Sequence, residues 1–215
     1  MTGRLRRQWL DEGAWLVHVP GWLAGTDALL REVQELDRFR QEHIVMYGRR
    51  VVQPRLTAWL GVEMDAASRY RTVRARRPFT PLVAALLAEL SALRDETGDP
   101  CGSPYNSVLV NWYRSGSDAI SWHADDEPTL GPEPVIASVT MGGSRTFALK
   151  PRGGGKRMAL SVGNGDLLVM GGDLQRRWLH SVPRRPAEKQ SRISLTFRRF
   201  LVDGAPAAGL KAAVT

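Results

Sequence analysis

The sequence has few of the residues that would place it among exported or membrane-spanning proteins. It contains one cysteine, Cys101, in 215 residues, which excludes an internal disulfide framework and agrees with a reducing cytoplasm. No apolar run approaches the roughly 20 residues that a membrane-spanning helix needs. The apolar run 14–19 follows several arginines, as in a signal peptide, but acidic residues separate it from them and His18 interrupts it. We therefore expect an unexported protein in the cytoplasm, with no membrane partner.

Acidic residues are also in the minority. The chain has 30 Lys plus Arg against 22 Asp plus Glu, which gives a net charge of +8. This balance favours a polyanionic partner such as nucleic acid. A solvated basic surface without any binding role gives the same balance. Charge alone therefore leaves both interpretations open.

Helical and strand patterns divide the chain into two unequal parts. The length suits a single domain, and we expect one domain over residues 1–215 and a monomer. Residues 27–39 and 81–98 have helical spacing of apolar residues, with Thr26 and Thr80 as caps and Gly98 as the end of the second helix. Both helices belong to the N-terminal part, residues 1–100.

The C-terminal part is a succession of short strands separated by glycine-rich turns. The expected strands are 107–113, 135–141, 146–150, 157–162, 166–170 and 192–200. Strands at this spacing imply a sandwich, of which a jelly roll is one solution. We therefore expect a mainly β, α+β fold in which the two helices cover one sheet, with residues 203–215 as a flexible tail.

The chain has only four histidines, and two of them, His123 and His180, are candidate metal ligands. In an extended segment, His123 and Asp125 project to the same side. One His, one Asp and a later His around a cation leave three positions open, as in non-haem Fe(II) oxygenases, and His180 is the candidate third ligand. A His-x-Asp triplet also arises by chance in solvated loops, and a core histidine is the other interpretation of His180. We expect His18 and His43 to be structural or solvated.

The last predicted strand alternates polar and apolar residues. Four polar residues share one face: Arg192, Ser194, Thr196 and Arg198. Two arginines pointing into a barrel mouth would be costly without anions, and the roughly 20 Å of strand between them leaves room for a short dicarboxylate. The alternative is that this face is exposed and the apolar face packs the core. Asn111 and Tyr113 also share a strand face and could offer an amide and a phenol to the same cavity.

Aromatic residues among arginines occur in the N-terminal part. Residues 43–61 are irregular and basic and include Tyr47 and Trp59, and residues 69–77 place five arginines around Tyr70. Such segments suit nucleic acid, because rings stack on bases and guanidiniums meet phosphates. Tyr47 can also be a core or edge-strand aromatic, the interpretation that we favour for Trp59, and residues 69–77 can be a solvated linker.

Four motifs in this order resemble the signature of a known family. They are Asn111-x-Tyr113-x-x-Gly116-x-Asp118, His123-x-Asp125-Asp126-Glu127, His180 and Arg192-x-Ser194-x-Thr196-Phe197-Arg198. They resemble the AlkB family of Fe(II)- and 2-oxoglutarate-dependent dioxygenases, especially its nucleic-acid dealkylating branch. The resemblance covers about half the chain, residues 106–200. It implies a double-stranded β-helix (jelly roll) catalytic core over 101–200, preceded by an extension, 1–100, with substrate-recognition loops.

The resemblance also implies roles for individual residues. Three match the iron ligands and hence the catalytic centre: His123, Asp125 and His180. Five match contacts of the cosubstrate 2-oxoglutarate: Asn111, Tyr113, Arg192, Thr196 and Arg198. Five fall where relatives contact substrate: Asp126 beside the flipped base, Tyr47 and Gly48 in a loop that probes the duplex, Arg55, and Tyr70 near the base-stacking aromatic. Ser194 departs from the family, where asparagine is common.

The implied reaction consumes O2 and 2-oxoglutarate at Fe(II) and yields succinate and CO2. An N-alkyl group on a base of DNA or RNA, such as that of N1-methyladenine or N3-methylcytosine, is hydroxylated and leaves as an aldehyde. This would be oxidative DNA repair or RNA demethylation, with the base flipped or in a single strand. Two other hypotheses remain: the same chemistry on a protein or small molecule, and a nucleic-acid-binding module without catalysis.

Overall fold

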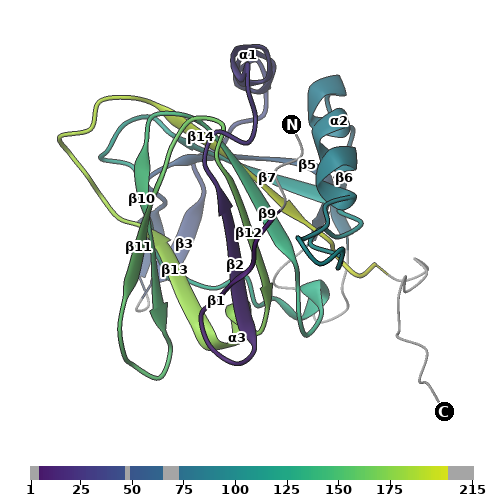
Figure 1. Cartoon of the computed structure of the whole chain (residues 1–215). Helices are drawn as coiled ribbons and strands as arrows, with labels where there is room; N and C mark the ends of the chain where they lie inside the picture. Colours follow the sequence, from purple (N-terminus) through teal and green to yellow (C-terminus); the bar gives the residue numbers. More distant parts are fainter. Residues whose placement is uncertain (1–4, 47–48, 65–72, 203–215) are drawn as a thin grey trace.

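The computed structural model describes residues 5–46, 49–64 and 73–202 (Figure 1). Tyr47, Gly48, Tyr70 and the predicted tail 203–215 lie outside the described residues. The fold is mainly β, as expected. In the described part of the chain, no helix is long and apolar enough to cross a membrane.

Two antiparallel sheets form the body of the molecule. The larger has the strand order β1 (Gln8–Trp9), β2 (Ala14–Val19), β12 (Leu167–Gly172), β9 (Ile136–Gly142), β14 (Arg192–Arg198), β7 (Ser107–Tyr113), β5 (Leu56–Met64) and β6 (Val73–Arg77). The smaller has the order β11 (Met158–Val162), β10 (Arg145–Pro151), β13 (Trp178–Val182) and β8 (Ile120–His123). A separate hairpin joins β3 (His43–Met46) to β4 (Arg49–Val52). The two facing sheets make the expected jelly roll.

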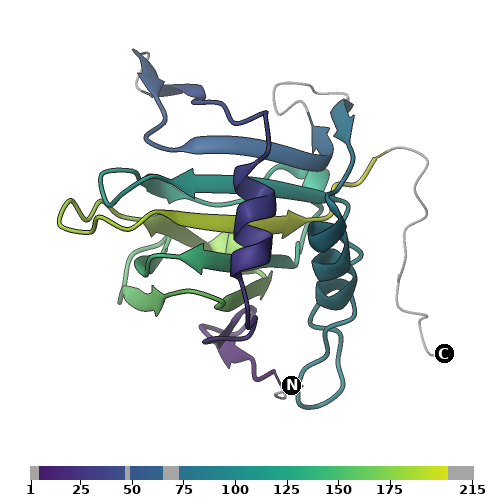
Figure 2. The ribbon, with the colours of Figure 1, turned by 90° about the horizontal axis from the view of Figure 1, so that it is seen from above.

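The helices lie mainly outside this sandwich. α1 (Asp27–Gln34) and α2 (Pro81–Ser91) cover the outer face of the larger sheet (Figure 2). α3 (Leu174–Arg177) is a single turn between β12 and β13, and a 3-10 turn, η1 (Pro128–Leu130), follows β8. The N-terminal helices therefore pack on one sheet, as the sequence predicts.

The larger sheet is buried on both faces, because it lies between two apolar clusters. On the helix side, Leu29 and Leu86 of the helices pack with strand residues such as Leu195. Between the sheets, residues such as Phe147 and Met170 form a second cluster. Every residue of the central strand β14 is consequently buried. Its apolar side chains face the helices, and its polar side chains remain for the space between the sheets.

Several predicted boundaries were wrong. α1 ends at Gln34 instead of residue 39, and α2 ends at Ser91 instead of Gly98. Leu36, Phe39 and Leu93 do pack on the core, but from non-helical segments, so their spacing resembled a continued helix. After α2 the Asp95 carboxylate accepts the main-chain N–H groups of two following residues and closes a turn.

Two segments that we expected to be irregular contain strands. Residues 43–61 include β3, β4 and most of β5, and the basic residues 73–77 form edge strand β6 instead of a linker. Trp59 is half-buried and packs near Phe200 with a ring separation of 6.1 Å, which confirms the structural interpretation of this tryptophan. Basic residues on an edge strand give no apolar signal, and this is why the strand was missed.

Candidate active site

A cavity between the two sheets collects the residues that the sequence singled out. It is lined from the larger sheet by residues of β7, β9 and β14, and from the smaller sheet by residues of β8, β10 and β13. His123 ends β8 and pairs directly with His180 of β13 across the antiparallel ladder. Asp125 follows two residues later, outside the strand. His180 lies within strand β13.

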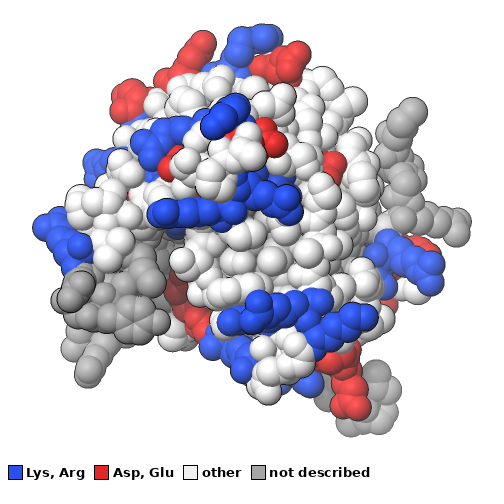
Figure 3. Space-filling model, turned by 90° about the vertical axis from the view of Figure 1, so that its left-hand side faces the viewer, with Lys and Arg blue, Asp and Glu red and all other residues white. Residues whose placement is uncertain are grey.

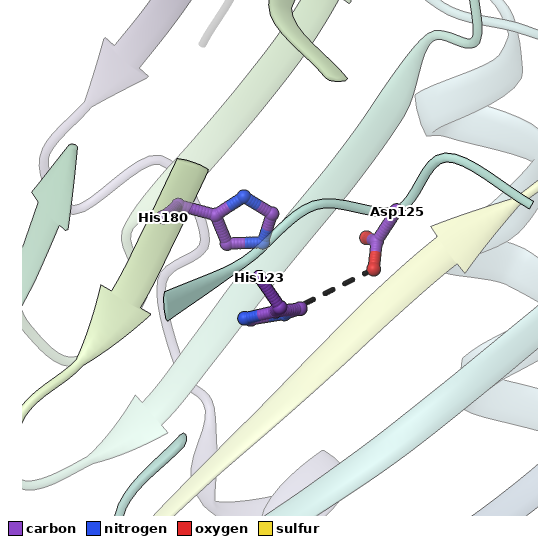
Figure 4. Close-up of side chains that lie close together, drawn as sticks. All are labelled: His123, Asp125 and His180. Atoms are coloured by element: carbon purple, nitrogen blue, oxygen red, sulfur yellow. Dashed lines mark ion pairs between the residues drawn. The ribbon is translucent and has the colours of Figure 1, made fainter. Parts of the chain in front are cut away.

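The two imidazoles and the carboxylate converge on one point (Figure 4). One ligand atom from each of His123, Asp125 and His180 lies within 4.8 Å of the others. Asp125 Oδ1 lies 4.0 Å from His123 Nε2, the contact drawn as a dashed line, and the two imidazole centroids are 4.2 Å apart. Such a spacing leaves room for a metal ion between the three side chains.

Neighbouring groups fix the two imidazoles. His123 Nδ1 donates to the carbonyl oxygen of Ser121 at 2.9 Å, which leaves Nε2 as the free electron-pair donor. His180 is buried and stacks on Phe147, with ring centroids 5.4 Å apart and an interplanar angle of 23°. Its Nδ1 has no hydrogen-bond partner among the described residues.

The protonation states also suit a metal. Burial by itself would raise the pKa of Asp125. The positive charge of Arg198, whose Nη2 donates to Asp125 Oδ1 at 2.7 Å, and the two imidazoles have a larger, opposite effect and lower this pKa to about 2. Burial, reinforced by His123, lowers the pKa of His180 to about 3, and burial lowers the pKa of His123 as well. One carboxylate and two neutral imidazoles are the deprotonated donors that a divalent metal requires.

Arg192 is a buried cation at the other end of the polar face of β14. It is 3% exposed, and its Nη2 donates to Thr140 Oγ1 at 3.0 Å. Its guanidinium lies 5.2 Å from the centroid of the Tyr113 ring. Its Nε and Nη1 have no partner among the described residues. A buried guanidinium with two unpaired N–H groups is costly unless an anion binds there.

The other residues expected to bind the cosubstrate line the same cavity: Asn111, Tyr113 and Thr196. Arg55 is buried and donates from Nε to Asn111 Oδ1 at 2.8 Å. The Ser194 hydroxyl lies 2.9 Å from that of Ser138. The polar face of β14 therefore lines the cavity between the sheets, which settles the choice between a cavity and an exposed face.

A second pocket of about 670 Å³ adjoins the first and shares His123 with it. Arg55 and Trp122 also line this pocket. Trp122 packs against two cations, with Lys150 Nζ 4.6 Å and the Arg157 guanidinium 5.9 Å from its ring centroid. Of the residues assigned to substrate, the structure places Arg55 here.

Asp126 carries an exposed carboxylate that Arg152 Nη2 contacts. Sequence reasoning missed this arginine, which stands at the end of β10. It also missed Gln175, whose Oε1 accepts the main-chain N–H of Asp125 at 2.9 Å, and the partner of His18, whose Nε2 lies 3.0 Å from Asp166 Oδ2. Each contact joins distant parts of the chain, so no local pattern signals it.

Comparison with known proteins supports the geometry. A family model described as the 2OG-Fe(II) oxygenase superfamily matches residues 16–198. The alpha-ketoglutarate-dependent dioxygenase alkB homolog 3 of Rattus norvegicus is 37% identical over 165 residues, which cover 72% of this chain and 53% of that protein. The chain thus spans about half the length of this relative.

Other relatives are matched over more of their length. The DNA oxidative demethylase ALKBH2 of Mus musculus is 32% identical over 192 residues, covering 83% of this chain and 76% of that protein. The solved structure of OsALKBH1 shares the fold, with a TM-score of 0.60 and 21% identity over 90% of this chain and all of that one. From the family match over most of the sequence and the identity to the mouse protein, the chain belongs to the AlkB family of the 2OG-Fe(II) oxygenase superfamily.

Proposed function

We propose that this protein is a dioxygenase that uses Fe(II), 2-oxoglutarate and O2 to remove N-alkyl groups from the bases of DNA or RNA. One observation carries the proposal: a single buried cavity holds a His–Asp–His donor set and, on the same wall, a buried arginine with two unpaired N–H groups. A metal-binding dicarboxylate is the ligand class that meets both requirements. Relatives named as oxidative demethylases support the choice of reaction.

His123, Asp125 and His180 would hold the metal. When bound, Fe(II) together with 2-oxoglutarate and O2 supplies the oxidation of an alkyl carbon and the release of succinate and CO2. The protein's part is to keep the carboxylate ionised, through Arg198, and the imidazoles neutral, through burial. Three protein ligands would leave further coordination positions of the metal for the reactants.

Arg192 would bind the distal carboxylate of 2-oxoglutarate through its unpaired Nε and Nη1. Thr140 and Tyr113 hold its guanidinium in place before the cosubstrate arrives, so little side-chain entropy is lost on binding. Arg198, six residues along the same strand, would lie near the metal-bound end. Asn111 and Thr196 would complete the polar lining.

The adjoining pocket would receive the target base. It opens beside His123 and is walled by Trp122, an aromatic suited to stacking against a base. Asp126 would offer its exposed carboxylate to the base, since N1-methyladenine and N3-methylcytosine carry a positive charge that a carboxylate attracts. Tyr47, Gly48 and Tyr70 stay predictions, since they lie outside the described residues.

The surface around the site favours a polyanion. Lys and Arg side chains gather in bands on the face shown in Figure 3, which is the side where β10 and β11 lie in Figure 1. Exposed basic residues occur in the β10–β11 turn and after β13: Arg152, Lys156, Arg157, Arg184 and Arg185. We further propose a single-domain monomer in the cytoplasm that acts on DNA, RNA or both. Residues 1–100 would frame the substrate and residues 101–200 would form the catalytic core.

The test is formaldehyde release from matched oligonucleotides that carry one N1-methyladenine or one N3-methylcytosine, with Fe(II) and 2-oxoglutarate present. Wild type should release formaldehyde, and His123→Ala should not. Glu89→Ala removes an exposed side chain of α2, on the outer face of the larger sheet and outside the cavity, and should behave as wild type.

Two results would contradict the proposal in different ways. Full activity of His123→Ala would refute the metal site. Succinate formation by wild type without formaldehyde from any strand type would show that the oxidation is right and the nucleic-acid substrate is wrong.

A further inference from the structure

Asp125 leaves the sheet that holds the other two metal-site residues. β8 ends at His123, and Asp125 is in a segment without regular structure. Its main-chain N–H donates to a side chain, Oε1 of Gln175, at 2.9 Å. Its carboxylate is held by Arg198. The position of the carboxylate therefore depends on two side chains from elements distant in sequence.

Gln175 is unusually well placed to act as a support. It lies in α3, is 1% exposed, and its Nε2 contacts the Met170 sulfur at 3.6 Å. A long polar side chain is rarely buried this fully unless its polar atoms have partners. Here the amide spans from β12 to the segment that carries Asp125.

The same residue also reaches Asp126. The main-chain oxygen of Gln175 accepts a hydrogen bond from Arg152 Nη2 at 3.3 Å, and the same Nη2 contacts the Asp126 carboxylate. The main-chain N–H of Arg152 donates to the Arg177 carbonyl at 2.8 Å, so α3 and the end of β10 are joined twice. Two adjacent carboxylates with different proposed roles are thus held from one helical turn.

We infer that Gln175 is a positioning residue. Its Oε1 sets the main chain of Asp125 so that the carboxylate faces the two imidazoles, and its carbonyl oxygen, through Arg152, orients the Asp126 carboxylate. The inference rests on the metal site proposed above. Outer-sphere partners of this kind change metal affinity by about 10- to 100-fold when removed. Since the Arg198 contact remains, the loss is partial.

The experiment is a Co(II) titration of the whole protein, followed by the ligand-field absorption of the bound ion. Gln175→Met keeps the length and packing of the side chain but leaves the Asp125 N–H without an acceptor. It should weaken Co(II) binding about 10- to 100-fold and alter the absorption bands. Hydrogen exchange should become faster in the peptide that contains Asp125.

Asn164→Leu is the matched control. Asn164 Oδ1 accepts two hydrogen bonds at 2.9 Å, from the main-chain N–H of Gly142 and from the Thr26 hydroxyl, in a turn that contributes nothing to the cavity lining. This variant loses at least as many hydrogen bonds as Gln175→Met and should bind Co(II) as wild type does. If Gln175→Met does not fold, Gln175→Asn, which is one methylene shorter, carries the same expectation.

Three outcomes overturn the inference. Wild-type Co(II) affinity in the Gln175 variants would show that the contact does not position the ligand. Equal weakening in Asn164→Leu would assign the effect to general stability. A folded wild-type protein that does not bind Co(II) would refute the metal site itself, and would thereby separate failure of the proposed function from failure of the role of Gln175.

Discussion

Arg192 and Arg198 lie six residues apart on one strand face, yet the same substitution should change stability in opposite directions. Arg192 has no anionic partner among the described residues, whereas Arg198 neutralises Asp125. Replacing Arg192 by Met removes an unpaired buried cation and should raise the free energy of unfolding of the ligand-free protein by about 1–3 kcal/mol. Arg198→Met leaves Asp125 buried without a partner and should lower it by about 3–5 kcal/mol.

Arg192→Met should stabilise the ligand-free protein but weaken its binding of 2-oxoglutarate. Truncating one partner of a buried, hydrogen-bonded charge pair costs about 2–5 kcal/mol, which weakens 2-oxoglutarate binding by about 30- to 4,000-fold. Wild type with 2-oxoglutarate at 100 times its Kd should gain about 2.7 kcal/mol of stability. At the same concentration Arg192→Met should gain at most about 0.9 kcal/mol, and almost nothing if binding is weakened 4,000-fold.

The assay is urea unfolding of both variants and of wild type, first without metal, and then with Mn(II) at zero 2-oxoglutarate and at 100 times the wild-type Kd. A destabilised Arg192→Met that still gains the full increment from 2-oxoglutarate would refute the assignment. Arg192→Lys keeps the charge but loses the planar guanidinium, which can donate two parallel hydrogen bonds to a carboxylate. We therefore expect this variant to bind 2-oxoglutarate with an intermediate affinity.

Two further predictions concern pH and salt. Burial by itself would raise the pKa of Asp166, but hydrogen bonds from two main-chain N–H groups and an imidazole lower this pKa by more. The ionised Asp166 carboxylate therefore stabilises the fold fully above about pH 4, and this stabilisation is lost as the pH falls through the lowered pKa. Asp166→Asn should remove this part of the acid unfolding curve, and an unchanged curve would contradict the reasoning. The double variant Lys156→Ala with Arg157→Ala should bind an oligonucleotide with a weaker dependence on salt. The slope of log Kd against log salt concentration, measured by fluorescence anisotropy, should fall by about 1–2. The exposed pair Arg31→Ala with Arg94→Ala, on and just after the N-terminal helices, should leave that slope unchanged.

The polar face of β14 shows which features of the site could be predicted from the sequence and which could not. Alternation identified which side chains share a face, because the strand period is two. It could not decide between a cavity and solvent, since that depends on what covers each face of the sheet. The helices α1 and α2 cover the apolar face and the smaller sheet covers the polar one, so all seven residues are buried.

The three metal-site residues could also be predicted from local signals in the sequence. His123 and Asp125 are close in the chain, and His180 was one of few remaining histidines. What joins them, the direct pairing of His123 with His180 across two strands, is a register that the sequence does not reveal. Gln175 and Arg152 were missed because a single glutamine in a short turn and an arginine after a strand have no distinguishing pattern.

The charges of the cavity explain why metal and cosubstrate should favour each other. Asp125 and Arg198 neutralise one another, and the imidazoles are held neutral, so Arg192 leaves the ligand-free cavity positive. A divalent cation alone would add to that charge, and a dianion alone would lack the metal that chelates one of its ends. With both bound, the charges of the dication and the dianion would cancel. By linkage, each ligand must then raise the affinity of the other by the same factor. Arg192 therefore supports metal binding only when the dicarboxylate is present, while Arg198 supports it at all times.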